Sequence, residues 1–331
     1  MRIGLAGLGR IGTVHADILH GMDAVGSLVV ADADPARART EADRLGVEAL
    51  ESPDGLFSAG LDGLVIAAST GAHAGLIIAA VRAGLPVFCE KPVAEGAEST
   101  LAVVREVGAA PVQIGFQRRY DAGFAAARAA VAAGELGWIH TVRAGTMDPA
   151  PPTPAYLASS GGFFRDCSVH DFDAIRWVTG RQVREVYAAG ANHGAGMFHE
   201  LGDVDAVAAL LTLDDGAFAL VSGTRYNAAG YDVRLEVLGS RQGIAVGLDA
   251  GLPLRSAEPG VDFPEGQAYR QFTDRFRAAY IAELEAFVAL VAGQGEVTCT
   301  VHEALEAFYV AEACEISRRE RRAVSIAEVR R

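Results

Sequence analysis

The feature that most constrains this chain is a glycine pattern behind its first apolar run. Residues 3–6 form that run, and residues 7–12 read GLGRIG and open an amphipathic stretch. A GxGxxG pattern between a strand and a helix is typical of a dinucleotide-binding turn. In such a turn Gly7 permits the tight bend, Gly9 lets the backbone approach a pyrophosphate, and Gly12 allows close packing of helix on strand. The N-terminal part is therefore expected to begin with a βαβ unit.

An acidic residue follows the second apolar run. Asp32 lies twenty residues after Gly12, a position where a carboxylate accepts hydrogen bonds from the ribose hydroxyls of an adenosine. Such a carboxylate repels a 2′-phosphate, so the sequence favours NAD over NADP. Arg37 and Arg39 on the next expected helix can offset part of this repulsion.

The pattern of apolar runs predicts two domains. Up to about residue 116, short apolar runs alternate with amphipathic stretches, which is typical of a parallel sheet with crossover helices. The expected strands are 3–6, 28–31, 64–67, 86–89 and 112–115, and the expected helices are 11–20, 35–45, 72–83 and 97–107. We predict a doubly wound Rossmann α/β domain at residues 1–120.

The second part, residues 121–331, has a different pattern and predicts an α+β domain. A proline cluster at 149–154 is expected to be loop. Apolar runs separated by turn signals predict antiparallel hairpins. The expected helices are 122–132, 167–178, 272–291 and 301–319, and the expected strands are 139–147, 183–188, 204–213, 217–224 and 232–238.

Charge and composition exclude several classes of partner. The chain has 331 residues with 42 acidic and 29 basic side chains, which gives a formal charge of −13. This charge disfavours nucleic acids and anionic membrane surfaces. The apolar runs are shorter than the roughly 18 residues that span a bilayer. The four cysteines form no CxxC pair, so we expect free thiols and a cytoplasmic protein.

One cation stands out. Lys91 is the only lysine in a chain that otherwise uses arginine, and it follows the expected strand 86–89 within the sequence Glu90-Lys91-Pro92. Ligands of open α/β sheets bind at the carboxyl ends of the strands. A lysine amine, unlike a guanidinium, can lose its proton when its surroundings lower its pKa. Lys91 is therefore a candidate for proton chemistry.

A second polar cluster follows Gly161 and Gly162. Asp166 and His170 are four residues apart, so on a helix their side chains share one face. A secondary alcohol that loses hydride must also lose its hydroxyl proton, and a neutral imidazole is suited to accept it. His170, Asp171 and Asp173 are alternative candidates for metal ligands, but their spacing matches no ligand motif. We predict no metal.

At these residues the chain resembles the family of NAD(P)-dependent sugar and polyol oxidoreductases that includes glucose-fructose oxidoreductase and inositol 2-dehydrogenase. The resemblance extends over essentially the whole chain. Segments 115–121 and 169–173, with Arg275-Phe276 and Ala279-Tyr280, are most similar to inositol 2-dehydrogenases. The proline-rich segment 148–154 departs from that pattern, so substrate identity is less constrained than reaction type.

The resemblance implies a set of site residues. It implies a catalytic group of Lys91, Asp166 and His170, in which either Lys91 or His170 exchanges the proton. Arg118, Asp148 and Tyr231 would approach substrate hydroxyls. The implied cofactor-binding residues, including those of the glycine turn, are Gly7, Gly9, Arg10, Ile11, Gly12, Asp32, Ser69, Thr70, His73 and Glu90.

The resemblance also implies the reaction. We expect NAD-dependent oxidation of a secondary hydroxyl of a cyclic polyol or sugar, in a homo-oligomer, dimer or tetramer, assembled through an open, mostly antiparallel sheet of the second domain. A keto-sugar reductase with the same site and a non-catalytic NAD(P)-binding sensor are the alternatives. A sensor has no physical need for Lys91 together with Asp166 and His170, which favours an enzyme.

Overall fold

The computed structural model describes residues 1–264 and 266–330, which form two compact units. The first unit comprises residues 1–117 and 278–305, and the second comprises 118–277 and 306–331. The chain thus returns to the first unit near its C-terminal end, a return that composition and periodicity did not predict. The assignment of cofactor binding to the first unit, and of substrate binding and oligomerisation to the second, stays a prediction.

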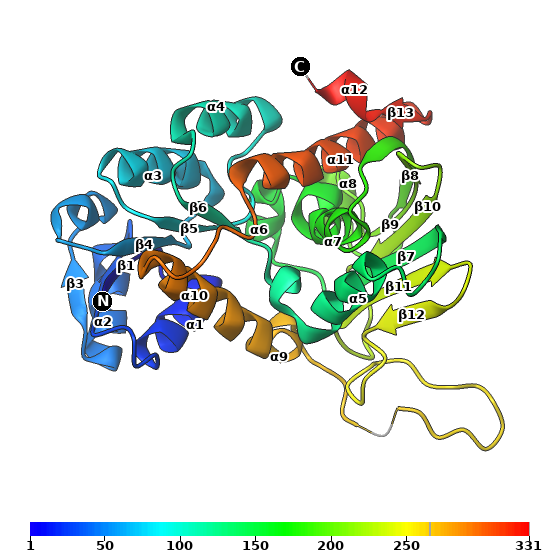
Figure 1. The fold of residues 1–331 in the computed structure, drawn as a ribbon, viewed down its shortest axis with the longest axis horizontal. Helices are drawn as coiled ribbons and strands as arrows, with labels where there is room; N and C mark the ends of the chain where they lie inside the picture. Colours follow the sequence, from blue (N-terminus) through cyan, green and yellow to red (C-terminus); the bar gives the residue numbers. More distant parts are fainter. Residues whose placement is uncertain (265, 331) are drawn as a thin grey trace. The chain divides into compact units, whose positions relative to one another are not determined.

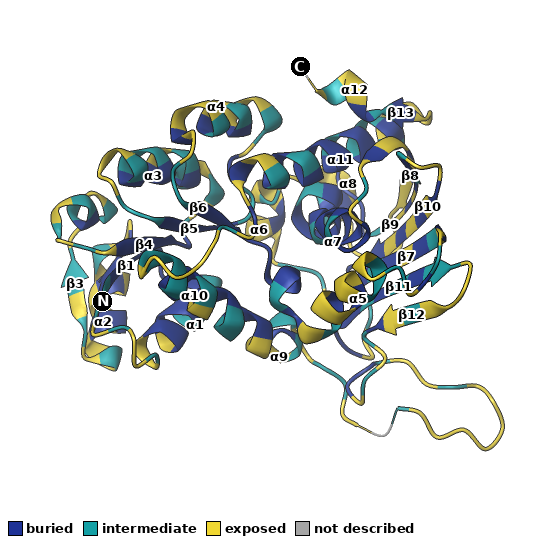
Figure 2. Ribbon diagram, in the orientation of Figure 1, coloured by how far each residue is buried: buried dark blue, intermediate teal, exposed yellow. Residues whose placement is uncertain are grey.

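The first unit is built on a parallel sheet of six strands in the order β3-β2-β1-β4-β5-β6 (Figure 1). The strands are β1 (Arg2–Ala6), β2 (Ser27–Ala31), β3 (Glu48–Leu50), β4 (Gly63–Ile66), β5 (Val87–Glu90) and β6 (Val112–Gly115). Strands β4, β5 and β6 are buried along their whole length, as Figure 2 shows in dark blue. This burial explains their mostly apolar sequences, because helices cover both faces of a parallel sheet. The predicted doubly wound fold is confirmed, with β3 as an additional edge strand.

Helices cover both faces of this sheet. Helices α1 and α2 contact one another beneath one face, and α3 and α4 contact one another over the other (Figure 1). The returning helix α10 joins the first layer, where Phe287 packs with its ring centroid 5.9 Å from that of Phe88. The helices of this unit are α1 (Arg10–His20), α2 (Pro35–Leu45), η1 (Pro53–Ser58), α3 (Thr70–Arg82), α4 (Ala97–Val107) and α10 (Arg277–Val291).

The second unit contains a seven-stranded mixed sheet in the order β12-β11-β7-β10-β9-β8-β13. Along β9 and β10 buried and exposed residues alternate, so one face packs on the core and the other is exposed (Figure 2). The strands are β7 (Ile139–Met147), β8 (Val183–Ala191), β9 (Ala206–Leu213), β10 (Phe218–Thr224), β11 (Asp232–Gly239), β12 (Gly243–Val246) and β13 (Val324–Ser325). The predicted open, mostly antiparallel sheet is confirmed.

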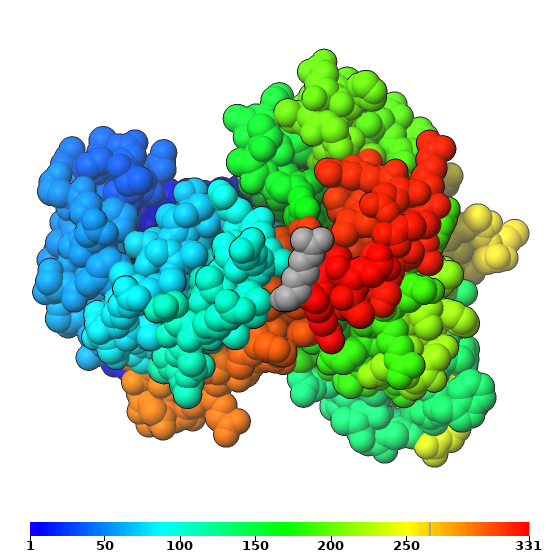
Figure 3. All heavy atoms as spheres, turned by 90° about the horizontal axis from the view of Figure 1, so that it is seen from above, coloured from blue at the N-terminus to red at the C-terminus, as the bar shows by residue number. Residues whose placement is uncertain are grey.

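The remaining helical segments lie on the second unit or lead into it. In the space-filling view the C-terminal segment, in red, lies against residues drawn in green (Figure 3), and within this segment β13 pairs with β8. The remaining helical segments are η2 (Gln117–Tyr120), α5 (Ala122–Ala132), α6 (Pro154–Ser159), η3 (Phe164–Ser168), α7 (Val169–Thr179), α8 (Met197–Glu200), α9 (Phe272–Arg275), α11 (Val301–Glu320) and α12 (Ile326–Val329).

Three sequence expectations for residues 121–331 are corrected by the structure. The later strands do not form successive hairpins throughout, because β7 lies between β10 and β11 and pairs with β10 in parallel. The proline cluster is not all loop, because Pro154 begins α6, where its missing N–H costs nothing. The expected helix 272–291 is interrupted at Phe276, between α9 and α10.

A long segment connects β12 to α9 and extends away from the sheet (Figure 1). Its base is held by Asp249, which accepts a hydrogen bond from Tyr269 at 3.2 Å. Within the described part of the chain, no helix is both long and apolar enough to cross a bilayer.

Candidate active site

The glycine turn after β1 has a geometry that only glycine permits at two positions. Gly7 has a φ of +96°, and a Cβ there would lie 2.5 Å from the backbone of Ala68. A Cβ on Gly12 would lie 2.1 Å from the carbonyl oxygen of Gly7. Because glycine has no Cβ, α1 can pack directly against the end of β1, which agrees with the roles expected of Gly7 and Gly12.

Gly9 differs from its two neighbours. A Cβ added there meets nothing within 4 Å, so the fold itself does not exclude a side chain. Gly9 is the N-cap of α1, and none of the described side chains caps the helix there. The open space and the uncapped N–H groups of the first turn form a cradle that suits a pyrophosphate.

Asp32 lies directly after β2 and is 5% exposed. Its Oδ2 accepts a hydrogen bond from the backbone N–H of Leu8 at 2.7 Å, and its Oδ1 accepts one from the N–H of Asp34 at 2.8 Å. Arg37 donates to Oδ1 at 3.1 Å from the first turn of α2. The carboxylate is thus fixed beside the glycine turn, with a cation at its outer side.

Ser69, Thr70 and His73 gather where β4 leads into α3. Ser69 is the N-cap of α3, and Thr70 is its first residue. His73 is buried; its Nδ1 lies 2.7 Å from the carbonyl oxygen of Pro92 and its Nε2 lies 3.0 Å from that of Ala68. His73 therefore joins the ends of two neighbouring strands.

Glu90 ends β5, and Lys91 follows it at the carboxyl edge of the sheet. The Oε1 of Glu90 lies 2.7 Å from Nε2 of His15, a fully buried histidine of α1. Sequence reasoning missed His15. The signal was its position, because Gly12, His15, Ala16 and Leu19 form the buried face of α1, and a histidine on such a face requires a buried partner.

In the second unit Asp166 is held by two donors. It lies in η3, a π-helical segment that runs into α7, and such segments often occur at functional sites. Tyr156 of α6 donates to its Oδ1 at 2.8 Å, and Arg225 donates to its Oδ2 at 2.7 Å. His170 lies in the first turn of α7.

Asp148 bonds to the other terminal nitrogen of the same guanidinium group. Arg225 donates to its Oδ2 at 2.8 Å, and the thiol of Cys167 lies 3.5 Å from the same oxygen. Burial works against the charge of Arg225, but the acidic groups of Cys167, Asp166 and Asp148 outweigh it and raise the pKa of the guanidinium. Arg225 was not identified from sequence, because no local pattern links it to residues 59 and 77 positions away.

Arg118 and Asp171 form a neighbouring buried ion pair at 2.6 Å. Arg118 also donates to the hydroxyl of Thr146 at 2.7 Å, and that hydroxyl donates to Asp171. Burial raises the pKa of the Asp171 carboxyl, although Arg118 acts to lower it. The contact of Arg118 with a substrate stays a prediction, because two of its donor atoms already bond within the unit.

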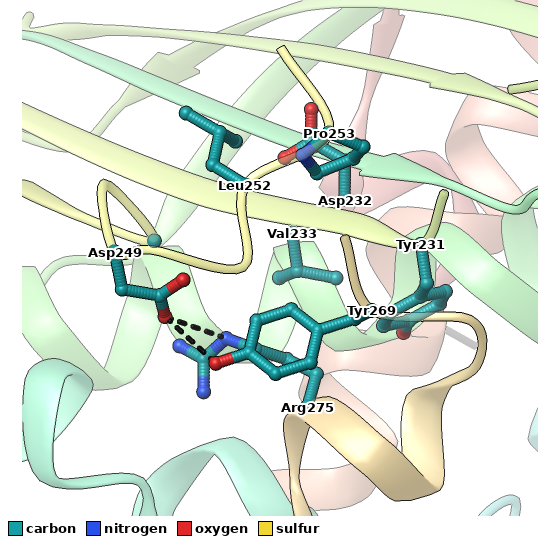
Figure 4. Close-up of a pocket in the computed structure, with 9 residues that line it drawn as sticks. Tyr231, Asp232, Val233, Asp249, Leu252, Pro253, Tyr269 and Arg275 are labelled. Carbon is teal, nitrogen blue, oxygen red and sulfur yellow. Dashed lines mark hydrogen bonds and ion pairs between the residues drawn. The ribbon is translucent and has the colours of Figure 1, made fainter. Parts of the chain in front are cut away.

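Tyr231 is buried before β11 and lines a small cleft with Asp249, Tyr269 and Arg275 (Figure 4). Burial raises the pKa of its hydroxyl well above the ordinary value. In Figure 4 the carboxylate of Asp249 faces both the Tyr269 hydroxyl and the Arg275 guanidinium. The cleft therefore holds its own ion pair, and a substrate contact by Tyr231 stays a prediction.

The acidic residues considered as metal ligands are engaged elsewhere. Asp171 pairs with Arg118, and Asp173 pairs with Arg119 at 2.6 Å with both side chains almost fully buried. Among residues 1–264 and 266–330, no group of three or more His, Cys, Asp or Glu side chains is arranged to hold a metal ion.

Comparison with known proteins gives matches for both units. Residues 1–116 match the family described as "Oxidoreductase family, NAD-binding Rossmann fold", and residues 124–245 match the "GFO/IDH/MocA C-terminal domain". A myo-inositol dehydrogenase, Hyg17, of Streptomyces leeuwenhoekii is 39% identical over 88% of this chain and 89% of its own length.

Two solved structures are similar over nearly the whole length. A myo-inositol dehydrogenase from Corynebacterium glutamicum has a TM-score of 0.89 and 35% identity, covering 98% of each chain. A scyllo-inositol dehydrogenase from Lactobacillus casei, with bound NAD(H) and scyllo-inositol, has a TM-score of 0.88 and 28% identity, covering 99% of each chain.

Proposed function

The chain belongs to the GFO/IDH/MocA family of NAD-binding oxidoreductases, and on that premise we propose that it oxidises a secondary hydroxyl of an inositol to a ketone with NAD. Relatives with inositol dehydrogenase names, similar over most of the chain, support this substrate class. The observation that carries the proposal is the ion-paired group of Asp148 with the buried Arg225 and Asp166, beside His170 in the adjacent turn of α7. Fixed carboxylates of this kind accept hydrogen bonds from polyol hydroxyls.

The residues of the first unit fit NAD. The open space at Gly9 and the uncapped start of α1 suit the pyrophosphate, and the fixed carboxylate of Asp32 suits the adenosine ribose. When bound, the nicotinamide accepts the hydride that the alcohol carbon loses. Arg37 offsets part of the Asp32 charge, but the carboxylate still repels a 2′-phosphate, so NADP is expected to be the weaker cofactor.

The protein's own groups handle the proton. Loss of hydride from the alcohol carbon requires loss of the hydroxyl proton, and the imidazole of His170 or the amine of Lys91 accepts it. Arg225 and Tyr156 bond to the carboxylate oxygens of Asp166 and fix this side chain four residues before His170. The protonated amine of Lys91 would stabilise the alkoxide.

The test is reduction of NAD by the purified protein, followed by absorbance, with inositol isomers, common aldoses and NADP in parallel. Lys91→Met should lower turnover by about 100-fold or more, the usual contribution of a proton-transfer group, and leave NAD affinity within a few-fold. Arg82→Met is the matched control because Arg82 forms an exposed ion pair with Glu106, and it should retain activity. His170→Gln, assayed as a function of pH, separates the two candidate bases.

Each other outcome has a defined meaning. Substantial residual activity in Lys91→Met would remove Lys91 from the mechanism. Bound NAD without turnover of any polyol, but with oxidation of NADH by keto-inositols, would favour a keto-sugar reductase. NAD binding without measurable turnover in either direction would favour a non-catalytic sensor.

The proposed assembly is a homo-oligomer, a dimer or tetramer, through the exposed face of the second unit's sheet. Tyr187, Leu210 and Leu220 lie in register across β8, β9 and β10, and each is at least 42% exposed. Phe218 extends the same apolar face. A second copy would bury this row of apolar side chains. Leu210→Glu should therefore lower the mass measured by light scattering, while the protein remains folded.

We also infer a cytoplasmic location. The four cysteines are buried and none forms a disulfide, and reduced thiols are typical of proteins in a reducing compartment. Fractionation of cells that produce the protein tests this inference.

A further inference from the structure

One arginine joins two carboxylates that the sequence analysis assigned to different tasks. Arg225 follows β10 and is 3% exposed. Its Nη1 donates to Asp148, which was expected to bind substrate, and its Nη2 donates to Asp166, which was expected to handle the proton. The guanidinium carbon also lies 4.9 Å from the centroid of the Phe163 ring. The guanidinium is therefore fixed from three sides.

The planar shape of the guanidinium is what this arrangement requires. Two carboxylates that bond to neighbouring nitrogens of one guanidinium are close enough to repel one another, and the shared cation offsets that repulsion. A lysine amine is a point charge and does not reproduce the fork geometry. Removal of the cation would leave the two carboxylates facing each other without their shared donor, and at least one of them would move.

The carboxylate oxygens that face away from Arg225 differ in their partners. Oδ1 of Asp166 accepts a hydrogen bond from Tyr156. Both contacts of Asp148 use its Oδ2, and across the described ranges no protein donor bonds to its Oδ1. The Asp148 side chain is also 20% exposed. Its Oδ1 is therefore the oxygen that can accept a substrate hydroxyl.

We propose that Arg225 is a positioning residue that couples substrate binding to proton transfer. It holds Asp166 in one orientation for the proton-handling group and presents Oδ1 of Asp148 to a polyol hydroxyl. This inference rests on the proposed oxidation of a polyol. It assigns Arg225 no contact with the reacting atoms; its effect passes through the two carboxylates.

The test compares Arg225→Met and Arg225→Lys with Arg165→Met. Arg165 is the matched control because it lies beside Asp166 in sequence, in the same unit, but pairs with Glu312. Steady-state kinetics with inositol and with carbon-deuterated inositol give kcat, KM and the primary isotope effect. Fluorescence titration gives NAD affinity, and circular dichroism verifies folding.

We expect kcat, KM and the isotope effect to change in the Arg225 variants, while NAD affinity stays nearly constant. Arg225→Met should lower kcat by about 100-fold and raise KM for inositol by about tenfold, the equivalent of one lost hydrogen bond. The isotope effect should rise because chemistry becomes rate-limiting, and the NAD dissociation constant should stay within twofold. Arg225→Lys should fold and lower kcat by about tenfold. Arg165→Met should stay within threefold of the wild type in all four quantities.

Three results would overturn the inference. The first is a folded Arg225→Lys protein with wild-type kcat and KM. The second is a parallel loss of activity and NAD affinity in both Arg225 variants, which indicates a general structural role. The third is a wild-type protein without polyol turnover, which overturns the proposed function as well and is thereby distinguished from the first two.

Discussion

The cofactor end of the first unit and the carboxylate cluster of the second unit both depend on buried acidic groups, but they obtain their donors differently. Asp32 receives hydrogen bonds from the backbone N–H groups of Leu8 and Asp34, which the turns after β1 and β2 bring to it. Asp166 and Asp148 depend on the side chain of Arg225, which lies 59 and 77 residues away. A site built from backbone turns leaves a readable sequence pattern, and a site built from distant ion pairs does not.

The largest expected effect concerns a buried ion pair of the second unit. Arg118→Met leaves the Asp171 carboxylate without its cation, and loss of one partner of a buried pair costs about 3 to 5 kcal/mol. Burial already raises the pKa of Asp171, and the substitution raises it further. The folded variant then binds a proton that the unfolded chain releases, so its stability falls as pH rises above the ordinary carboxyl range.

Chemical denaturation at pH 5 and pH 8 measures this effect. The stability difference from wild type should be larger at pH 8, because a protonated Asp171 needs no cation. Arg39→Met removes an exposed pair with Glu51 and should change stability by no more than about 1 kcal/mol at either pH. An Arg118→Met protein as stable as the control at pH 8 would contradict the argument.

The next effect separates two glycines of the turn. Gly12→Ala places a Cβ 2.1 Å from a backbone oxygen and should cost about 3 kcal/mol of stability. Gly9→Ala meets no neighbour and should cost about 1 kcal/mol at most. Gly9→Ala should nevertheless weaken NAD binding at least tenfold, because its methyl group occupies the pyrophosphate cradle. Thermal unfolding and NAD titration of both variants measure the two effects; equal NAD affinity in Gly9→Ala and wild type would rule out the cradle.

A smaller effect is expected at Asp32. Asp32→Ser removes the carboxylate that we propose to accept hydrogen bonds from the ribose hydroxyls and to repel a 2′-phosphate. Hydrogen bonds to charged groups are worth about 1.5 to 3 kcal/mol, so the ratio of NADP to NAD dissociation constants should fall by about tenfold to 100-fold. An unchanged ratio in fluorescence titrations would show that Asp32 does not select the cofactor.

The smallest effect is expected at Arg37. Its side chain is about half exposed and bonds to Asp32 at 3.1 Å, so it offsets part of the carboxylate charge. Arg37→Ala should raise the ratio of NADP to NAD dissociation constants by about threefold, within the range for exposed ion pairs. In the Asp32→Ser background the same change should weaken NADP binding, because Arg37 is then available to a 2′-phosphate. No change in either background would limit Arg37 to a surface role.

The sequence by itself determined the parallel sheet and the glycine turn. The apolar runs of β1, β4, β5 and β6 are buried on both faces, and the turn residues bond to groups near them in the chain. The short edge strand β3 escaped prediction, because its three residues carry no apolar run and it forms only by pairing with β2.

Only the tertiary structure decided which groups bond to the acidic residues that the sequence singled out. Asp148, Asp166 and Glu90 were named from the sequence, but their partners Arg225, Tyr156 and His15 were not. Each of these partners bonds to an acidic group that it meets through packing, over 77, 10 and 75 residues respectively. Local periodicity records which face of an element is buried, whereas the pairing of buried charges depends on which elements meet in the folded chain. The insertion of β7 between β10 and β11 is set by the same long-range packing.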